Sequence, residues 1–229
     1  MNNHNILYLI WKNPRNRRNY TVGKLCRENE KYTFEYCFEN EKAQKDGWDL
    51  IRAFPEVKKY ESDTLFPAFA SRLPDRKRRN IEEILKKYHL DYYDGFELLR
   101  RSGGRLPIDT YEFIDPIFDE DKTIERDFFI VGIRHTSGCE GKDCQMRPAL
   151  KVSMKLKLIP EPSNEYDPDA IQVYTENGKI LGYIPRYYSK SIHHRLNKGM
   201  TYECIVVETN SQLGCQQCVK VKLIMPKRE

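Results

Sequence analysis

The sequence has no long hydrophobic run and no charged-then-apolar segment near its start. Its longest apolar stretch, Ile6–Trp11, is far shorter than the roughly 20 residues that a membrane-spanning helix needs. A secretory leader would place basic residues before a central apolar stretch, and no such segment precedes Ile6. We therefore expect a cytoplasmic protein that makes no contact with a membrane.

The even number of cysteines that is typical of a disulfide-bonded secreted domain is also missing. The 229 residues include seven cysteines, and this odd count favours reduced thiols. Two close pairs stand out, Cys139 with Cys144 and Cys215 with Cys218. Four thiolates could hold a structural zinc ion if the two pairs met. The wide spacing of the first pair favours free thiols, so we expect no cofactor, with structural zinc as the alternative.

The composition is not that of a disordered chain, because 39% of the residues are hydrophobic and 12% are aromatic. At roughly 100–200 residues per domain, the length fits one large domain or two small ones. Charge is uneven along the chain: residues 1–125 are neutral overall, and the whole excess of +5 lies in residues 126–229. A basic second half favours a phosphate-bearing partner such as nucleic acid, although ordinary solubilising charge is the alternative.

The first half alternates between apolar runs and polar turns. Strands rich in β-branched and aromatic residues are expected at Ile6–Trp11, Tyr20–Cys26 and Tyr32–Phe38. Two helices are expected, one that follows a cap at Asn80 and extends to Lys87, and one at Gly95–Arg101 that ends at Gly103-Gly104. We expect residues 1–115 to form a small α+β domain with a β-meander.

The second half is mainly β in pattern. The acidic, proline-containing stretch Asp115–Arg126 breaks both periodicities and predicts a linker over residues 116–126. Strands are expected at Phe128–Arg134, Ala149–Leu158, Ile171–Tyr174, Ile180–Ile184, Tyr202–Glu208 and Val219–Met225. One helix is expected near Lys190–Asn197, and the Asn-Gly of Thr175–Gly178 predicts a tight hairpin. Residues 127–229 should form a small barrel of OB- or SH3-like size, which makes the whole chain α+β.

Three motifs in this second half resemble the HIRAN family over about residues 127–226. They are Val131-Gly132-Ile133-Arg134-His135, Tyr166-Asp167-Pro168-Asp169-Ala170-Ile171 and Gly182-Tyr183-Ile184-Pro185. The first motif matches the first strand of the family. This resemblance implies an OB-like barrel that grips the 3′ end of single-stranded DNA, as in a helicase-like fork-remodelling protein.

The resemblance also implies which residues bind. Tyr166 would stack on a terminal base, and Asp167 would accept a hydrogen bond from a terminal hydroxyl while repelling a phosphate. Arg134 and Arg186 match positions that hold phosphates, with Arg186 in place of a lysine. His135 replaces an aromatic residue and gives a smaller stacking surface. The alternative for Tyr166 and Asp167 is a local turn with no ligand, and for the two arginines a solvated surface.

A second resemblance covers about residues 5–115. The blocks Val22–Leu25, Leu65–Asp75 and Phe96–Leu99 are similar to the N-terminal subdomain of HipA-type toxin kinases. No phosphate-cradling glycine loop, catalytic-loop aspartate or metal-binding aspartate of a kinase accompanies them, so we expect no enzyme. In that family the subdomain sits on the kinase body and helps contact an antitoxin, and in some split systems it is a separate protein that restrains the kinase.

A HipA-like kinase or its complex is therefore an expected partner. Phe66 and Phe69 are candidate apolar anchors, and Arg72 and Arg76 are candidates for a charged rim. The alternatives are that the two phenylalanines belong to the core and that the basic run is a solvated helix start.

Three functional hypotheses follow. The first is a non-enzymatic adaptor in a toxin–antitoxin-type system that binds single-stranded DNA ends and engages a HipA-like kinase. The second is a protein–protein antitoxin or regulatory subunit without DNA binding, because His135 and the Gly214–Cys218 segment lack aromatic residues that the family uses. The third is a metal-dependent nuclease that uses Glu165, Asp167 and Asp169, although no lysine or histidine stands at a convincing catalytic spacing.

Overall fold

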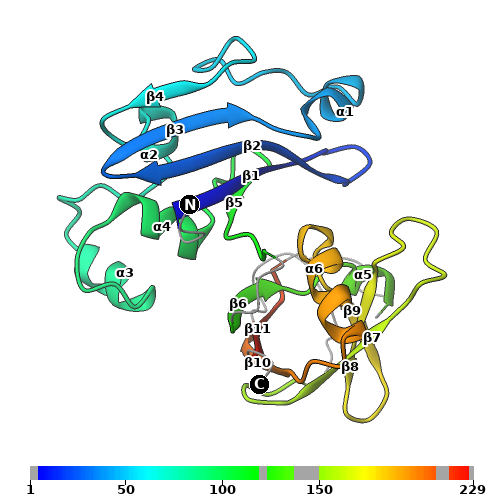
Figure 1. Ribbon diagram of the computed structural model, residues 1–229. Helices are drawn as coiled ribbons and strands as arrows, with labels where there is room; N and C mark the ends of the chain where they lie inside the picture. Colours follow the sequence, from blue (N-terminus) through cyan, green and yellow to red (C-terminus); the bar gives the residue numbers. More distant parts are fainter. Residues whose placement is uncertain (1–4, 119–122, 137–149, 210–216, 227–229) are drawn as a thin grey trace. The chain divides into compact units, whose positions relative to one another are not determined.

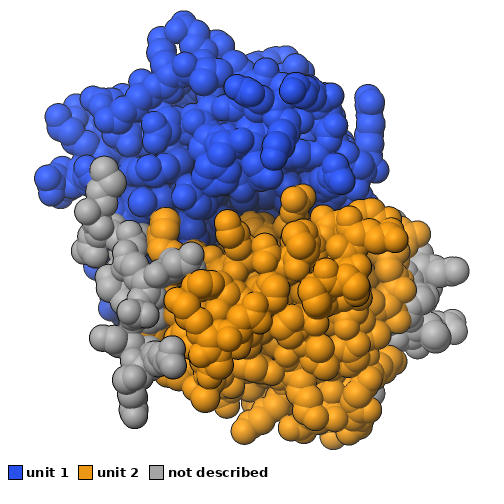
Figure 2. Space-filling view, turned by 45° about the vertical axis from the view of Figure 1, so that its right-hand side comes forward, with its two compact units in different colours: residues 1–116 blue, residues 117–229 orange. Residues whose placement is uncertain are grey.

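The chain folds into two compact units. In the computed structural model they comprise residues 1–116 and 117–229, which Figure 2 draws in two colours. The structure describes residues 5–118, 123–136, 150–209 and 217–226. The linker expected over residues 116–126 is longer than the structure shows, because residues at both of its ends belong to the compact units. Ile124–Phe129 is the first strand of unit 2, and buried Ile117 accepts a hydrogen bond on its carbonyl oxygen from the Ser191 hydroxyl of the same unit.

Unit 1 is built on a five-stranded antiparallel sheet with the strand order β4-β3-β2-β1-β5 (Figure 1). Its strands are β1 (Ile6–Lys12), β2 (Asn19–Glu28), β3 (Lys31–Tyr36), β4 (Tyr60–Ser62) and β5 (Tyr111–Ile114). Its helices are α1 (Asn40–Lys45), α2 (Pro67–Ala70), α3 (Ile81–Lys87) and α4 (Gly95–Ser102). The consecutive pairing of β1, β2 and β3 confirms the expected meander.

Aromatic rings fill the core of unit 1, and Phe66 and Phe69 belong to it. The Phe69 ring centroid lies 5.1 Å from that of Phe34 and 5.2 Å from that of Phe54. Phe66 and Phe69 are both buried, and they join the cluster that also holds Trp48. The expectation that these two phenylalanines anchor a partner protein is therefore wrong, because their side chains are occupied in packing the core.

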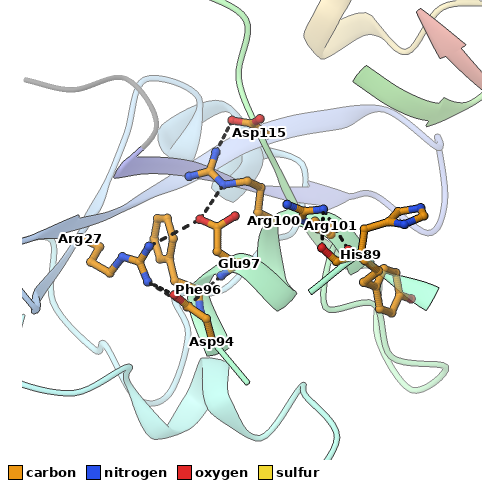
Figure 3. Close-up of polar contacts among 9 residues, drawn as sticks. Arg27, His89, Asp94, Phe96, Glu97, Arg100, Arg101 and Asp115 are labelled. Carbon is orange, nitrogen blue, oxygen red and sulfur yellow. Dashed lines mark hydrogen bonds and ion pairs between the residues drawn. The ribbon is translucent and has the colours of Figure 1, made fainter. Parts of the chain in front are cut away.

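Charged side chains fix helix α4 (Figure 3). Asp94 caps the helix by accepting hydrogen bonds from the amides of Phe96 and Glu97, and it also pairs with Arg27 of β2 at 2.6 Å. Burial raises the pKa of Asp94, but Arg27 and the capping amides outweigh it, so the pKa lies below its ordinary value. Glu97 and Arg100 continue the chain of ion pairs to the aspartate that follows β5. The helix ends as expected, at a left-handed glycine.

Unit 2 contains two three-stranded antiparallel sheets, β10-β11-β6 and β7-β8-β9. Its strands are β6 (Ile124–Phe129), β7 (Leu156–Pro160), β8 (Ile171–Thr175), β9 (Ile180–Tyr183), β10 (Glu203–Thr209) and β11 (Val219–Met225). Two isolated bridges join the sheets, one between Val131 and Tyr183 and one between Lys155 and Ile205. The sheets therefore meet along both pairs of edges and close into a small barrel (Figure 1). The expected mixed fold with a β-rich second part is confirmed.

Three local expectations need correction. The expected strand Phe128–Arg134 stops at Phe129, because the chain turns at Gly132 with φ +77° and continues as the short helix α5 (Ile133–Thr136). Of the expected strand Ala149–Leu158, only the last residues belong to β7. Asn80 does precede α3, but its side chain accepts a hydrogen bond from Arg78 and does not cap the helix.

Helix α6 (Arg186–Asn197) begins one turn earlier than expected and has one buried face. That face includes Tyr188 and Ile192, and the Tyr188 ring lies 5.7 Å from the Phe128 ring of β6. On the opposite face the residues are polar and exposed. None of the helices in the described part of the chain is long and apolar enough to cross a membrane.

Replacing Phe69 with alanine should lower the free energy of unfolding of unit 1 by about 3–5 kcal/mol, because a buried ring is replaced by a cavity. Tryptophan fluorescence in urea reports on this unit, since both tryptophans of the chain, Trp11 and Trp48, lie in its core. The control is Phe38→Ala, which removes a ring that is 70% exposed and should cost less than about 1 kcal/mol. Equal losses in the two variants would contradict the placement of Phe69.

Candidate nucleic-acid interface

The candidate binding residues of unit 2 gather at one end of the β7-β8-β9 sheet. Strands β8 and β9 are antiparallel, so the start of β8 and the end of β9 lie at the same end of the sheet. The loop 161–170, which carries Tyr166 and Asp167, leads into β8, and Arg186 follows β9 as the first residue of α6. In Figure 1 this loop lies toward the upper end of the unit, and the turn 176–179 lies at its lower end.

Asn164 shapes the loop. Its side-chain oxygen accepts hydrogen bonds from the amides of Tyr166 at 3.0 Å and Asp167 at 3.1 Å. This Asx turn fixes the backbone of both residues. The Tyr166 side chain points outward and is 77% exposed. A ring that is exposed to this degree offers a face on which a base can stack.

The carboxylate of Asp167 has one oxygen in use. Its Oδ1 atom accepts a hydrogen bond from the Asp169 amide at 3.0 Å. Its Oδ2 atom makes no hydrogen bond with any residue that the structure describes, and the residue is half-buried. The free oxygen can accept a hydrogen bond from a ligand hydroxyl, and the negative charge disfavours a phosphate at the same place.

Two side chains outside the turn support the loop. Glu161 accepts hydrogen bonds from Asn164 and from Gln172 of β8, both at 2.7 Å. On the other side, Nδ1 of His193 in α6 lies 2.9 Å from Oδ1 of Asp169. The loop is therefore tied both to the sheet and to α6, and it is held in place before any ligand arrives.

A close backbone contact holds α5 beside β9. Val131 and Tyr183 exchange two hydrogen bonds, of 3.0 and 2.8 Å. The contact depends on Gly182, because a Cβ atom there would lie 2.3 Å from the Val131 carbonyl oxygen. Such an approach is closer than any real Cβ contact, so only glycine fits at this position.

Helix α5 and the start of α6 supply the positive charge. Arg134 and His135 are exposed on α5, and the Thr136 hydroxyl ties this helix to the Leu181 carbonyl at 2.8 Å. Arg186 is exposed as well. Within the described residues, none of these three basic side chains forms an ion pair with a carboxylate. They are available to phosphate oxygens.

Unit 1 carries a second candidate site, which we call the Tyr92 groove. It has a volume of about 650 Å³ and includes Leu65 and Leu73 in its lining. Tyr92 is 72% exposed, and the neighbouring Tyr93 ring lies 4.6 Å from the Arg76 guanidinium. This groove combines the exposed Tyr92 with the half-buried Tyr93 and an arginine, and tyrosine and arginine are enriched at protein interfaces.

Arg72, in contrast, is not part of an open charged rim. Its guanidinium binds both carboxylate oxygens of Asp109, at 2.7 and 2.8 Å, and its Nε donates to the Gly104 carbonyl at 2.7 Å. The Arg72 side chain is only 8% exposed. The expectation of a partner-binding role for it is corrected accordingly: Arg72 fastens the segment before β5, whereas Arg76 is exposed.

Two protein-family profiles match this chain. The HipA N-terminal domain profile matches residues 17–107, and the HIRAN domain profile matches residues 125–223. The chain carries both domains. The fusion expected from the sequence is therefore confirmed, and the presence of a HIRAN domain indicates nucleic-acid binding.

Solved structures also resemble the chain. A protein from Lactobacillus plantarum is 26% identical, with a TM-score of 0.37, over 45% of this chain and 94% of its own. The HIRAN domain of human HLTF is 17% identical, with a TM-score of 0.35, over 46% of this chain and 75% of its own. A search of the curated proteins gives no match.

The metal predictions for the HIRAN domain remain predictions. Cys139, Cys144 and Cys215 lie outside the described residues, and Cys218 is buried directly before β11. In the part of the chain that the structure describes, no group of three or more His, Cys, Asp or Glu side chains is placed to hold a metal ion. Of the acidic residues considered for a nuclease, Asp169 pairs with His193 of α6, and Oδ1 of Asp167 accepts a hydrogen bond from the Asp169 amide.

Sequence reasoning missed the residues that support the site in the HIRAN domain. Asn164 carries a local signal, because an asparagine two residues before the tyrosine is typical of an Asx turn. Gly182 carries a weaker one, an isolated glycine inside a strand. Glu161 and His193 carry none, because the contacts of Glu161 with Gln172 and of His193 with Asp169 join separate elements of the fold.

Gly182→Ala should detach α5 from β9, because the new methyl group collides with the Val131 carbonyl. Hydrogen exchange of the Val131 and Tyr183 amides should become at least about tenfold faster. The matched control is Gly178→Ala, which also alters a glycine with positive φ but in open space. Unchanged exchange in Gly182→Ala would show that the contact does not hold α5.

Proposed function

We propose that the HIRAN domain binds the 3′ end of single-stranded DNA, and that the chain is a non-enzymatic adaptor whose HipA N-terminal domain engages a HipA-like kinase. The first part is supported above all by the exposed Tyr166 ring next to the open oxygen of Asp167, in a loop fixed by Asn164. Binding of nucleic acid in general agrees with the domain type. The preference for a 3′ end and the kinase partner are the proposal.

Tyr166 would provide most of the contact with the terminal base. Stacking of a base on an exposed aromatic ring stabilises binding by about 1–3 kcal/mol and tolerates any sequence. Because the backbone of Tyr166 is already fixed by Asn164, little conformational entropy is lost on binding. The site would therefore recognise an end without reading its sequence.

Asp167 would distinguish a free 3′ hydroxyl from a phosphate or a continuing strand. A hydroxyl can donate a hydrogen bond to the open Oδ2 atom, whereas a phosphate brings negative charge close to the carboxylate. Arg134 and Arg186 would hold the phosphates that precede the end. His135 would contribute a smaller ring beside them.

The HipA N-terminal domain would supply the partner contact. The Tyr92 groove is the surface that supports this part of the proposal, because Tyr92 and Arg76 are exposed there and the residues first expected as apolar anchors are buried. The adaptor would then bring a kinase complex to DNA ends, in a toxin–antitoxin-type system.

Tyr166→Ala should weaken the binding of a 3′-hydroxyl oligonucleotide by about five- to 150-fold, the loss expected from one stacked base. Asp167→Asn should reduce the preference of the protein for 3′-hydroxyl over 3′-phosphate ends, because the repelling charge is removed. Fluorescence anisotropy with the two labelled oligonucleotides measures both effects on the full chain.

Tyr92→Ala is the control for these experiments, since it removes an equally exposed ring from the other domain and should leave DNA binding unchanged. Wild-type protein that binds both ends equally, or a Tyr166→Ala variant with wild-type affinity, would refute recognition of the 3′ end.

The alternative function is a protein–protein antitoxin or regulatory subunit without DNA binding, which the small ring of His135 favours. Co-expression with a HipA-like kinase tests the partner contact that both functions share. We expect the kinase to copurify with the wild-type chain. The Tyr92→Ala variant should retain little of the kinase, and the Tyr166→Ala variant should retain as much as wild type. If the Tyr92→Ala variant copurifies with the kinase as well as wild type does, the Tyr92 groove is not the binding surface for the kinase.

A further inference from the structure

The exposed face of helix α6 is lined with basic side chains. Arg186, Lys190, His194 and Lys198 follow each other at four-residue intervals along α6 and its C-terminal cap, and all four are exposed. The opposite face, with Tyr188 and Ile192, is buried against the barrel. Four-residue steps place successive side chains on one side of a helix, about 6 Å apart along its axis. The four residues thus form a continuous basic stripe.

Within the described residues, no carboxylate forms an ion pair with the lysines of the stripe. The sequence of α6 contains no aspartate or glutamate, and neither Lys190 nor Lys198 forms an ion pair with a described carboxylate. Positive charge near the last turn of a helix is favourable, but positive charge near its first turn opposes the helix dipole. Arg186, the first residue of α6, is therefore placed where its charge does not stabilise the helix, which points to a role in binding.

The stripe also begins at the candidate interface. Arg186 is one of the cations at the end of β9, and His193 on the neighbouring face of α6 pairs with Asp169 in the loop that carries Tyr166. A strand held at its terminus by that loop has to leave the site, and α6 offers the adjoining row of positive charge. Phosphates follow each other along an extended strand at a spacing comparable to that of the stripe.

We propose that the α6 stripe is the path of the single-stranded DNA backbone upstream of the bound 3′ end, with Lys190 and Lys198 each contacting a phosphate along it. This inference rests on the proposed function and extends it, because it predicts that nucleotides beyond the terminal ones contribute to affinity. The contacts are made to phosphates alone, so they add affinity and salt dependence without sequence preference.

The test compares full-length wild type with the double variant Lys190→Gln/Lys198→Gln, using 3′-hydroxyl oligonucleotides of about three and about twelve nucleotides at several salt concentrations. Glutamine has nearly the helix propensity of lysine, so α6 should remain folded. The double variant should bind the long strand roughly tenfold more weakly at low salt, and its slope of log affinity against log salt should be shallower by about 1.4. Affinity for the short strand should change less than about twofold.

The control is Lys179→Gln, which removes one positive charge, against two in the double variant, at the exposed turn between β8 and β9, at the far end of these strands from the loop. This variant should behave as wild type. A double variant that matches Lys179→Gln on the long strand, or that weakens short and long strands equally, would overturn the path along α6. If wild type prefers neither a 3′ hydroxyl nor a 3′ phosphate, the proposed function fails instead, and a reduced salt slope in the double variant would still support the contact at α6.

Discussion

The end of the HIRAN domain that carries the candidate site depends on one backbone contact, the pair of hydrogen bonds between Val131 and Tyr183. This bridge joins the sheet that contains β6 to the sheet that contains β9, and it forms only because Gly182 lets the two backbones approach. Two consequences follow at the same place. The barrel closes along that edge, and α5 is brought to the end of β9, next to the residue that begins α6.

A second constraint is the rigidity of the loop beside this edge. Asn164 holds the backbone of Tyr166 and Asp167, Glu161 joins the loop to β8, and His193 joins it to α6. A ring and a carboxylate that are held in this way can meet a ligand without first being ordered, so less of the binding energy is spent on ordering. The polar residues of the loop therefore fix the geometry of the site.

Much of the fold could be predicted from the sequence, because the signals were local. Apolar alternation located β1 to β3, Asn-Gly located the turn before β9, and glycine marked the end of α4. The errors arose where long-range packing decides. Phe66 and Phe69 were candidate anchors with a core position as the alternative, and they fill a core made by distant residues, whereas Arg72 pairs with Asp109 across the domain. The turn at Gly132, which ends β6 early, directly follows the bridge between Val131 and Tyr183, a contact between residues far apart in the sequence.

The central claim is that one end of the barrel holds the terminus of a single strand. NMR of the full chain with a short 3′-hydroxyl oligonucleotide tests it most directly, because each backbone amide reports on its own surroundings. The account predicts that the largest shifts occur at the amides of Tyr166, Asp167 and Arg186. Shifts confined to the turn 176–179, or to the HipA N-terminal domain, would contradict it.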